Sequence, residues 1–140
     1  MRILAVDPGD KRIGIAISDP TKTIAKPVKV LRHTKRSEDA EKILQIASQN
    51  DVGQIIVGQT LDDEGNLTPQ GRKSFRLAEV IKKSSSIKVQ MWDETSSTKL
   101  AKRSRVEMNV SRRKRRGHLD DIAATIILQS YLDYLQKKKL

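Results

Sequence analysis

The chain has 140 residues, with 28 Lys or Arg against 17 Asp or Glu, a formal net charge of +11 and no cysteine. This length suits a single domain over residues 1–140, and the lack of cysteine excludes disulfides, thiolate metal sites and a cysteine nucleophile. No apolar run is long enough to cross a membrane, so we expect a cytoplasmic protein whose positive charge suits nucleic acid.

Two short apolar runs open the chain and bracket a tight loop. Residues 3–6 are all apolar and partly β-branched, which predicts a central strand buried on both faces. Asp7 closes this strand, the pair Pro8-Gly9 turns the chain, and residues 13–17 form the second run. This order leaves the Asp7 carboxylate at the rim of an apolar sheet. Taken alone, the local pattern favours an ordinary turn aspartate.

Three further elements extend the predicted sheet. Residues 23–31 alternate apolar and polar residues and contain Pro27, which predicts a third strand at the sheet edge. Apolar residues at helical spacing predict a helix over 37–50, and another apolar run predicts a strand over 54–58. A helix between two such strands implies a right-handed crossover, so the later strand should lie parallel to the first.

In the rest of the chain, the pattern predicts a polar loop over 60–69, a helix over 70–83 and a strand over 87–92. Two more helices are predicted over 96–105 and 118–135. The inward residues expected in the helix over 70–83 are Phe75, Ala78, Val80 and Ile81. Those expected in the last helix are Leu119, Ile122, Ala123, Ile126 and Ile127. The basic end, residues 137–140, is expected to fray.

The order of these elements predicts an α/β fold. Its five-stranded mixed sheet would contain a three-strand antiparallel meander, two parallel strands and flanking helices.

Three carboxylates stand where chemistry is plausible: Asp7 after the first strand, Glu94 after the fifth, and Asp120 in the first turn of the last helix. Each also has a structural interpretation, because acids are common in turns and first helical turns. Together they supply the oxygen ligands that Mg²⁺ or Mn²⁺ prefers. Should Glu94 point away, the loop acids Asp62, Asp63 and Glu64 are the expected replacements.

A strongly basic segment precedes Asp120. Residues 99–116 contain nine Lys or Arg and one acid, and they end in a run of five cations. Such a cluster neutralises backbone phosphates, and Lys11 and Arg12 beside Asp7 would extend the same surface. With 3% aromatic residues, we expect recognition of backbone and shape more than of sequence. The five cations are Arg112, Arg113, Lys114, Arg115 and Arg116.

At this point the sequence resembles a known family. Residues 7–14 (DPGDKRIG) match its opening motif, residues 93–101 resemble its D-E-R-x-T-T-x-x-A motif, and residues 120–132 match its closing motif. Gly65 and Phe75 resemble its central loop and helix. The chain is similar to the YqgF, or RuvX, family of small bacterial nucleases with a ribonuclease H-like fold.

The resemblance implies a metal-dependent nuclease acting at the 5′ end of pre-16S ribosomal RNA, in a superfamily shared with Holliday-junction resolvases. It carries Asp7, Glu94 and Asp120 over as the catalytic and metal-binding site, and it groups Thr98 with the nucleic-acid-binding residues. Thr95 stands where the family has Arg. That departure either weakens stabilisation of transition-state charge or is compensated by a cation from residues 112–116.

Three functions therefore remain open. The first is cleavage of structured RNA, and the second is resolution of branched DNA on the same site, where symmetric cleavage would need a dimer. The third is a non-catalytic module that binds RNA or the ribosome, which the Thr95 departure favours.

Overall fold

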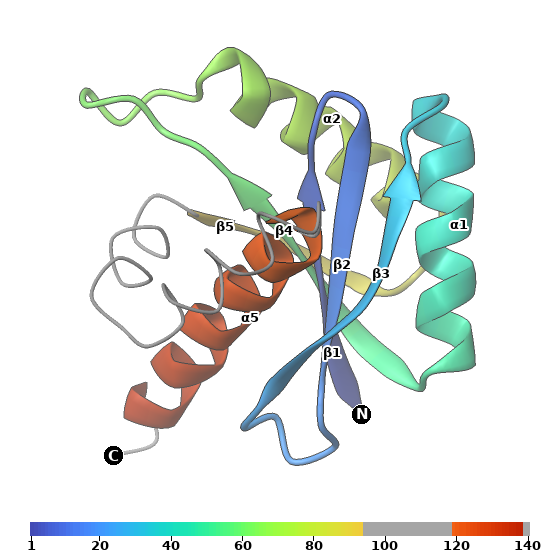
Figure 1. The fold of residues 1–140 in the computed structure, drawn as a ribbon, viewed down its shortest axis with the longest axis vertical. Coiled ribbons are helices and arrows are strands. Elements are labelled where there is room, and N and C mark those ends of the chain that lie inside the picture. The colour runs from blue at the N-terminus through green and yellow to red at the C-terminus, as the bar shows by residue number, and fades with distance from the viewer. Residues whose placement is uncertain (94–118, 139–140) are drawn as a thin grey trace.

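A five-stranded mixed sheet forms the centre of the molecule (Figure 1). The computed structural model describes residues 1–93 and 119–138. The strand order is β3-β2-β1-β4-β5, with β1 antiparallel to β2, β2 antiparallel to β3, and β4 parallel to both β1 and β5. This confirms the predicted meander with two parallel strands. The strands are β1 (Arg2–Pro8), β2 (Arg12–Ser18), β3 (Ala25–Arg32), β4 (Val52–Gln59) and β5 (Lys88–Asp93).

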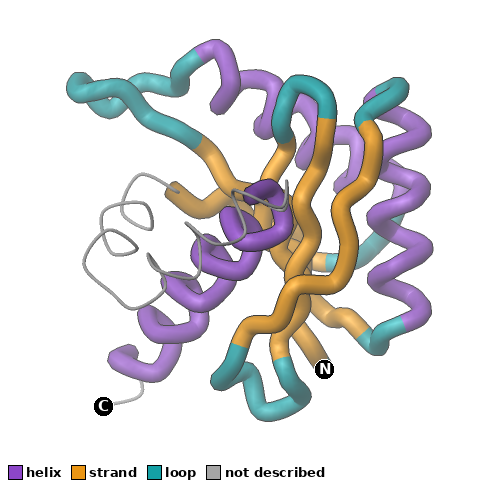
Figure 2. Tube along the Cα trace, in the orientation of Figure 1, coloured by secondary structure: helices purple, strands orange, loops and turns teal. Residues whose placement is uncertain are grey.

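Helices cover both faces of the sheet (Figures 1 and 2). α1 (Arg36–Gln49) and α2 (Pro69–Ser84) lie side by side on one face, and α5 (Leu119–Lys138) crosses the other. The helix predicted over 96–105 lies outside the described residues. α5 continues beyond its predicted end, so Lys137 and Lys138, which we expected in a frayed tail, lie in its last turn.

The central strand is buried on both faces, as its sequence predicts. Leu4 and Val6 of β1 belong to a hydrophobic cluster with α1 and α2. Ile3 and Ala5, on the alternate positions, belong to a second cluster with α5. Burial on both sides explains why residues 3–6, between Arg2 and Asp7, are all apolar.

The predicted inward face of α2 is wrong at Phe75. This side chain is 44% exposed, and the buried positions are Gly71, Ser74, Leu77, Ala78 and Ile81. The helix begins after Thr68, whose hydroxyl accepts a hydrogen bond from Gly71 N at 3.1 Å. Phe75 therefore lies one position outside the stripe that contacts the sheet, and Val80 is only partly buried.

α5 follows its predicted stripe in part. Ile122 and Ile127 are buried, whereas Ala123 and Ile126 are half-buried and the Leu119 side chain is outside the described part of the chain. The other buried positions of the helix are Ala124, Leu128, Tyr131 and Leu132. Within residues 1–93 and 119–138, no helix is long and apolar enough to span a membrane.

Candidate functional site

Asp7 lies at the carboxyl end of the central strand. Ile3 and Ala5 face α5, and strand alternation places Asp7 on that same face. Its backbone pairs with Gly14 of β2, and the side chain is half-buried. The fold therefore fixes this carboxylate at the rim of the sheet, where open α/β folds place ligand sites.

The tip of the β1–β2 hairpin is held tightly beside Asp7. Gly9 N donates to Arg12 O at 2.8 Å, and a Cβ on Gly9 would lie 2.7 Å from that oxygen, so the turn requires glycine. Lys11 O accepts from His33 N at 2.9 Å. Lys11 and Arg12 are exposed at this end of the sheet, as expected for residues that contact nucleic acid.

Asp10 belongs to the opposite side of the hairpin tip. Its carboxylate accepts a hydrogen bond from Lys73 Nζ at 2.9 Å. This hydrogen bond and the Lys73 charge hold the pKa of Asp10 below its usual value. Asp10 is therefore ionised at neutral pH and bound to α2.

The carboxyl end of β5 opens at the same edge of the sheet as that of β1. Val6 pairs with Val57, and Val57 with Met91, so the three parallel strands end close to one level. Trp92 faces α5, where its indole N–H donates to Ser130 Oγ at 3.0 Å. Glu94 follows two positions later, but Glu94, Thr98 and residues 112–116 lie outside the described residues.

α5 runs across the sheet from the carboxyl end of β1 toward its amino end. Gln129 Oε1 accepts from Ala25 N at 3.0 Å, and Gln136 Nε2 donates to Lys22 O at 3.4 Å. Both contacts lie at the β2–β3 turn, near the start of β1. The amino end of α5 therefore lies toward the carboxyl end of β1 (Figure 1). The backbone of Asp120 belongs to this first turn of α5, whereas its side chain is outside the described part of the structure.

The donor chemistry of Asp7 fits a hard divalent cation. Carboxylate oxygens suit Mg²⁺ or Mn²⁺, whereas a chain without cysteine and with two histidines does not fit a thiolate or zinc site. Among residues 1–93 and 119–138, no three His, Asp or Glu side chains are grouped closely enough to hold a metal ion. The three-carboxylate site stays a prediction, because two of its members lie outside the described side chains.

The loop acids Asp62, Asp63 and Glu64 were the expected replacements for Glu94. Among the described residues, they form no group of three or more with Asp7 that could hold a metal ion. Asp62 instead closes its own turn, because its carboxylate accepts from Glu64 N and Asn66 N at 2.9 Å each. Asp63 and Glu64 are exposed.

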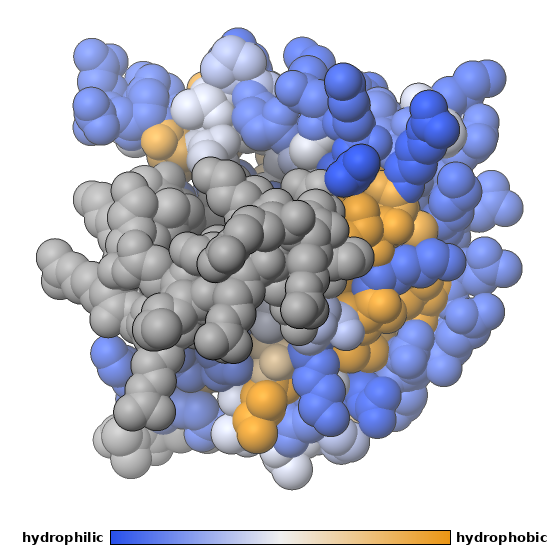
Figure 3. All heavy atoms as spheres, viewed as in Figure 1, coloured by the Kyte–Doolittle hydropathy of each residue, from blue (hydrophilic) through white to orange (hydrophobic). Residues whose placement is uncertain are grey.

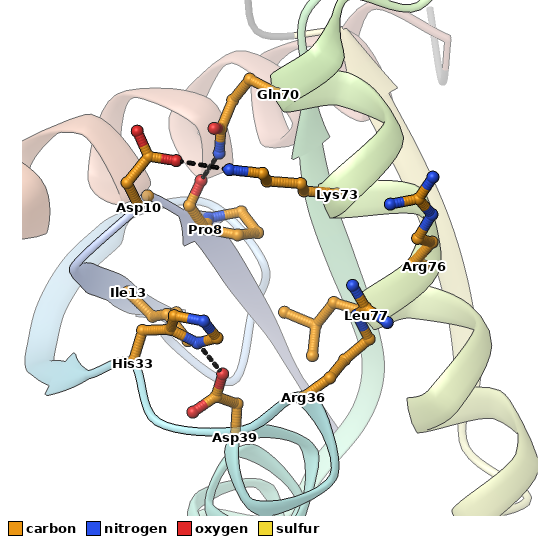
Figure 4. A pocket seen from close by; sticks show the side chains of 11 residues that line it. Pro8, Asp10, Ile13, His33, Arg36, Asp39, Gln70, Lys73, Arg76 and Leu77 are labelled. Atoms are coloured by element: carbon orange, nitrogen blue, oxygen red, sulfur yellow. Dashed lines mark hydrogen bonds and ion pairs between the residues drawn. The ribbon is translucent and has the colours of Figure 1, made fainter.

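The structure also contains a basic pocket that sequence reasoning missed. A cavity of about 150 Å³ lies behind the hairpin tip, on the face of the sheet that α1 and α2 cover (Figure 4). The signal for this pocket in the sequence is the spacing of Lys73 and Arg76, because residues three positions apart in a helix lie on the same face. Their meeting with His33 and Arg36 depends on tertiary packing. We call this cavity the α1–α2 pocket.

Comparisons with known proteins identify the family of the chain and agree with its fold. Residues 1–134 match the family described as "RuvX: Holliday junction resolvase". A Thermoanaerobacter pseudethanolicus protein named "Putative pre-16S rRNA nuclease" is 42% identical over 139 residues, covering 99% of this chain and 100% of that protein. A Clostridioides difficile protein of the same name is 41% identical over 133 residues, covering 95% of this chain and 94% of that protein.

Solved structures show the same fold at low sequence identity. Thermus thermophilus RuvC in complex with a Holliday junction substrate has a TM-score of 0.65 and 13% identity, covering 98% of this chain and 96% of RuvC. Fowlpox virus resolvase with Holliday junction DNA has a TM-score of 0.56 and 18% identity, covering 96% and 99% of the two chains. These likenesses confirm the ribonuclease H-like sheet. On the match over residues 1–134 and the identity of its relatives, the chain belongs to the RuvX family.

Proposed function

We propose that this protein is a divalent-metal-dependent nuclease that hydrolyses phosphodiester bonds in structured RNA, at the 5′ end of pre-16S ribosomal RNA. The observation that carries the proposal is the position of Asp7, at the carboxyl end of the central strand and on the face that α5 crosses. Relatives at 41–42% identity bear the name of a pre-16S rRNA nuclease. A ribosomal precursor as substrate would place the enzyme in the cytoplasm.

Asp7, Glu94 and Asp120 are the residues proposed to hold the metal. Mg²⁺ or Mn²⁺ at such a site supplies the charge that activates a water molecule and stabilises the leaving oxygen of a phosphodiester. Asp7 contributes a carboxylate from β1, a strand that pairs with β2 on one side and with β4 on the other, up to Val6. A rigid support of this kind is what a metal ligand requires for a constant position.

The proposed grip on the nucleic-acid backbone comes from cations around the site. Lys11 and Arg12 stand exposed at the hairpin tip beside Asp7. Thr98 and the run Arg112–Arg116 are proposed to contact phosphates from the segment that precedes α5. Contacts of this kind fix the position of the strand without reading its bases.

The experiment is cleavage of a pre-16S RNA fragment that contains the precursor 5′ end, with Mg²⁺ and with the metal removed by EDTA. We expect Asp7→Asn to reduce cleavage by roughly 100-fold or more, because one metal ligand supports several kcal/mol of transition-state stabilisation. Asp51→Asn is the matched control, because this substitution makes the same chemical change at the other end of the sheet, beside Arg2. Equal cleavage by the wild type and Asp7→Asn would refute the site.

Branched DNA is a second candidate substrate. It is favoured by the likeness of the fold to two resolvases whose structures contain Holliday junctions. Competition between a four-way DNA junction and the precursor RNA in one cleavage reaction separates the two, because the better substrate suppresses cleavage of the other. Tight, salt-dependent binding of either nucleic acid with no metal-dependent product would instead identify a binding module.

A further inference from the structure

We propose that the α1–α2 pocket binds a phosphate group of the nucleic-acid backbone, on the face of the sheet opposite Asp7. The pocket begins at Pro8, one residue after Asp7, and extends behind the hairpin to the start of α1 and the first turns of α2 (Figure 4). A strand bound at Asp7 would then pass over the hairpin tip. The inference rests on the proposed function only in taking the ligand to be nucleic acid.

Two arginines give the pocket unused positive charge. Arg36, from the first turn of α1, and Arg76, from α2, both line the cavity. No hydrogen bond or ion pair joins either guanidinium to another described residue. Guanidinium groups match the geometry of phosphate oxygens and bind them through paired N–H donors.

Lys73 supplies a third cation. Its ammonium group pairs with Asp10 at 2.9 Å, but both side chains are largely exposed, at 56% and 73%. An ion pair as open as this contributes little and exchanges readily. Lys73 is therefore able to contact a phosphate in the pocket while it remains close to Asp10.

A buried carboxylate positions the fourth polar group. The Asp39 side chain is 2% exposed and accepts hydrogen bonds from His33 Nδ1 and from Thr34 N. Because a carboxylate only accepts, Nδ1 carries the proton, and Nε2 remains for other contacts at the wall of the cavity. Burial of Asp39 is costly without these partners, so the pair fixes the ring beside the arginines.

The surroundings agree with a nucleic-acid surface. Hydrophilic residues cover the end of the molecule that contains the hairpin tip and the first turn of α1 (Figure 3). Lys11 and Arg12 stand on the same tip and are exposed. One nucleic-acid backbone can therefore contact cations on both sides of the hairpin. This accounts for a phosphate-binding pocket on the face of the sheet away from the proposed metal site.

The test measures RNA binding in EDTA, where cleavage plays no part. We expect the double variant Arg36→Ala/Arg76→Ala to bind the precursor fragment roughly tenfold more weakly, and the slope of log K against log salt to fall by about 0.7–0.9 for one lost phosphate contact. Lys82→Ala/Lys83→Ala removes the same charge from the far end of α2 and should leave the slope close to that of the wild type. Equal losses in the two variants would overturn the proposal.

A second measurement identifies the source of the phosphate. Inorganic phosphate and chloride are titrated at equal ionic strength while the His33 ring signals are followed by NMR. Shifts with phosphate alone, together with weaker RNA binding by the arginine variant, support a backbone phosphate. Shifts without any change in RNA binding would show a small-anion site and overturn it. Equal cleavage by the wild type and Asp7→Asn would refute the metal site and leave these binding results unaffected.

Discussion

The indole N–H of Trp92 donates a 3.0 Å hydrogen bond to the Ser130 hydroxyl, which joins the end of β5 to the middle of α5. The two ring contacts of Trp92, with Tyr131 and Tyr134, lie beside it, at centroid distances of 5.0 and 5.2 Å. Glu94 follows Trp92 by two positions, and Asp120 opens the same helix that contains Ser130. This contact therefore connects the two chain segments that carry the predicted acids.

Ser130→Ala is expected to lower the free energy of unfolding by about 1–3 kcal/mol, because it leaves the partly buried Trp92 N–H without an acceptor. If the contact also positions Glu94, single-turnover cleavage of the folded protein should fall as well. Urea unfolding and single-turnover cleavage measure the two effects. Ser84→Ala is the matched control, since its hydroxyl donates to Val80 O at the exposed end of α2. Equal destabilisation by the two substitutions would contradict the prediction.

Ser18→Ala should destabilise the strand that carries Asp7. The buried Ser18 hydroxyl accepts from Ile3 N at 2.9 Å, and removing it leaves a buried backbone N–H unpaired, at a cost of about 1–3 kcal/mol. Hydrogen exchange at the Ile3 amide, read together with thermal unfolding, checks this result. Ser86→Ala, at an exposed position, should change neither measurement.

Leu77→Ala and Phe75→Ala test which face of α2 contacts the sheet. Leu77 is 4% exposed, so its truncation should cost about 2–5 kcal/mol. Phe75 is 44% exposed, and its truncation should stay within about 0.5 kcal/mol of the wild type. Denaturant midpoints of the two variants give the answer. A larger loss at Phe75 would restore the inward face that the sequence predicts.

The error at Phe75 shows where periodicity stops being sufficient. A large aromatic residue in an amphipathic helix favours an inward position. The buried stripe of α2 is instead formed by Leu77, Ala78 and Ile81 and by the small residues Gly71 and Ser74, which hydrophobic periodicity does not count. Central strand β1 was easier to predict, since only a strand covered on both faces requires an unbroken apolar run. Packing, which the sequence does not display, decides the remaining cases.

The candidate site divides in the same way. Asp7 could be predicted because a carboxylate directly after a buried strand has few places to lie except the sheet rim. The α1–α2 pocket could not, because Asp39 is an ordinary first-turn acid in the sequence. Its burial against His33 exists only once the end of β3 and the start of α1 come together.

Gly9→Ala should distort the hairpin tip. The new methyl group would lie 2.7 Å from Arg12 O, a backbone atom that moves only with the turn. We expect a loss of about 1–3 kcal/mol in the free energy of unfolding, as for overpacked sites. Cleavage should fall further than folding stability explains, because Asp7 lies two residues before Gly9. Calorimetry with single-turnover cleavage measures both, and an unchanged Tm would contradict the crowding.

Asp19 should make stability depend on pH. Its carboxylate accepts from Thr23 N at 2.8 Å and Ile24 N at 2.9 Å, and these hydrogen bonds, the one from Ile24 first, hold its pKa far below the usual value of 3.8. Because the folded pKa is the lower one, the stabilisation is present above the unfolded pKa and is lost as the pH falls below it. The Tm difference between wild type and Asp19→Asn should shrink from pH 7 to pH 3, whereas a constant difference would contradict the prediction.

The second hydrophobic cluster joins two elements that lie far apart in the sequence, because Ile3 and Ala5 of β1 belong to it together with Ala124 and Leu128 of α5. During synthesis, β1 emerges from the ribosome well before α5, so this face of the strand lacks its helix until α5 has been made. In a nascent chain, this second core therefore forms only once α5 has followed the five strands. Removing α5 should therefore produce an aggregation-prone fragment, because the apolar residues of β1 that face this helix lose their partner.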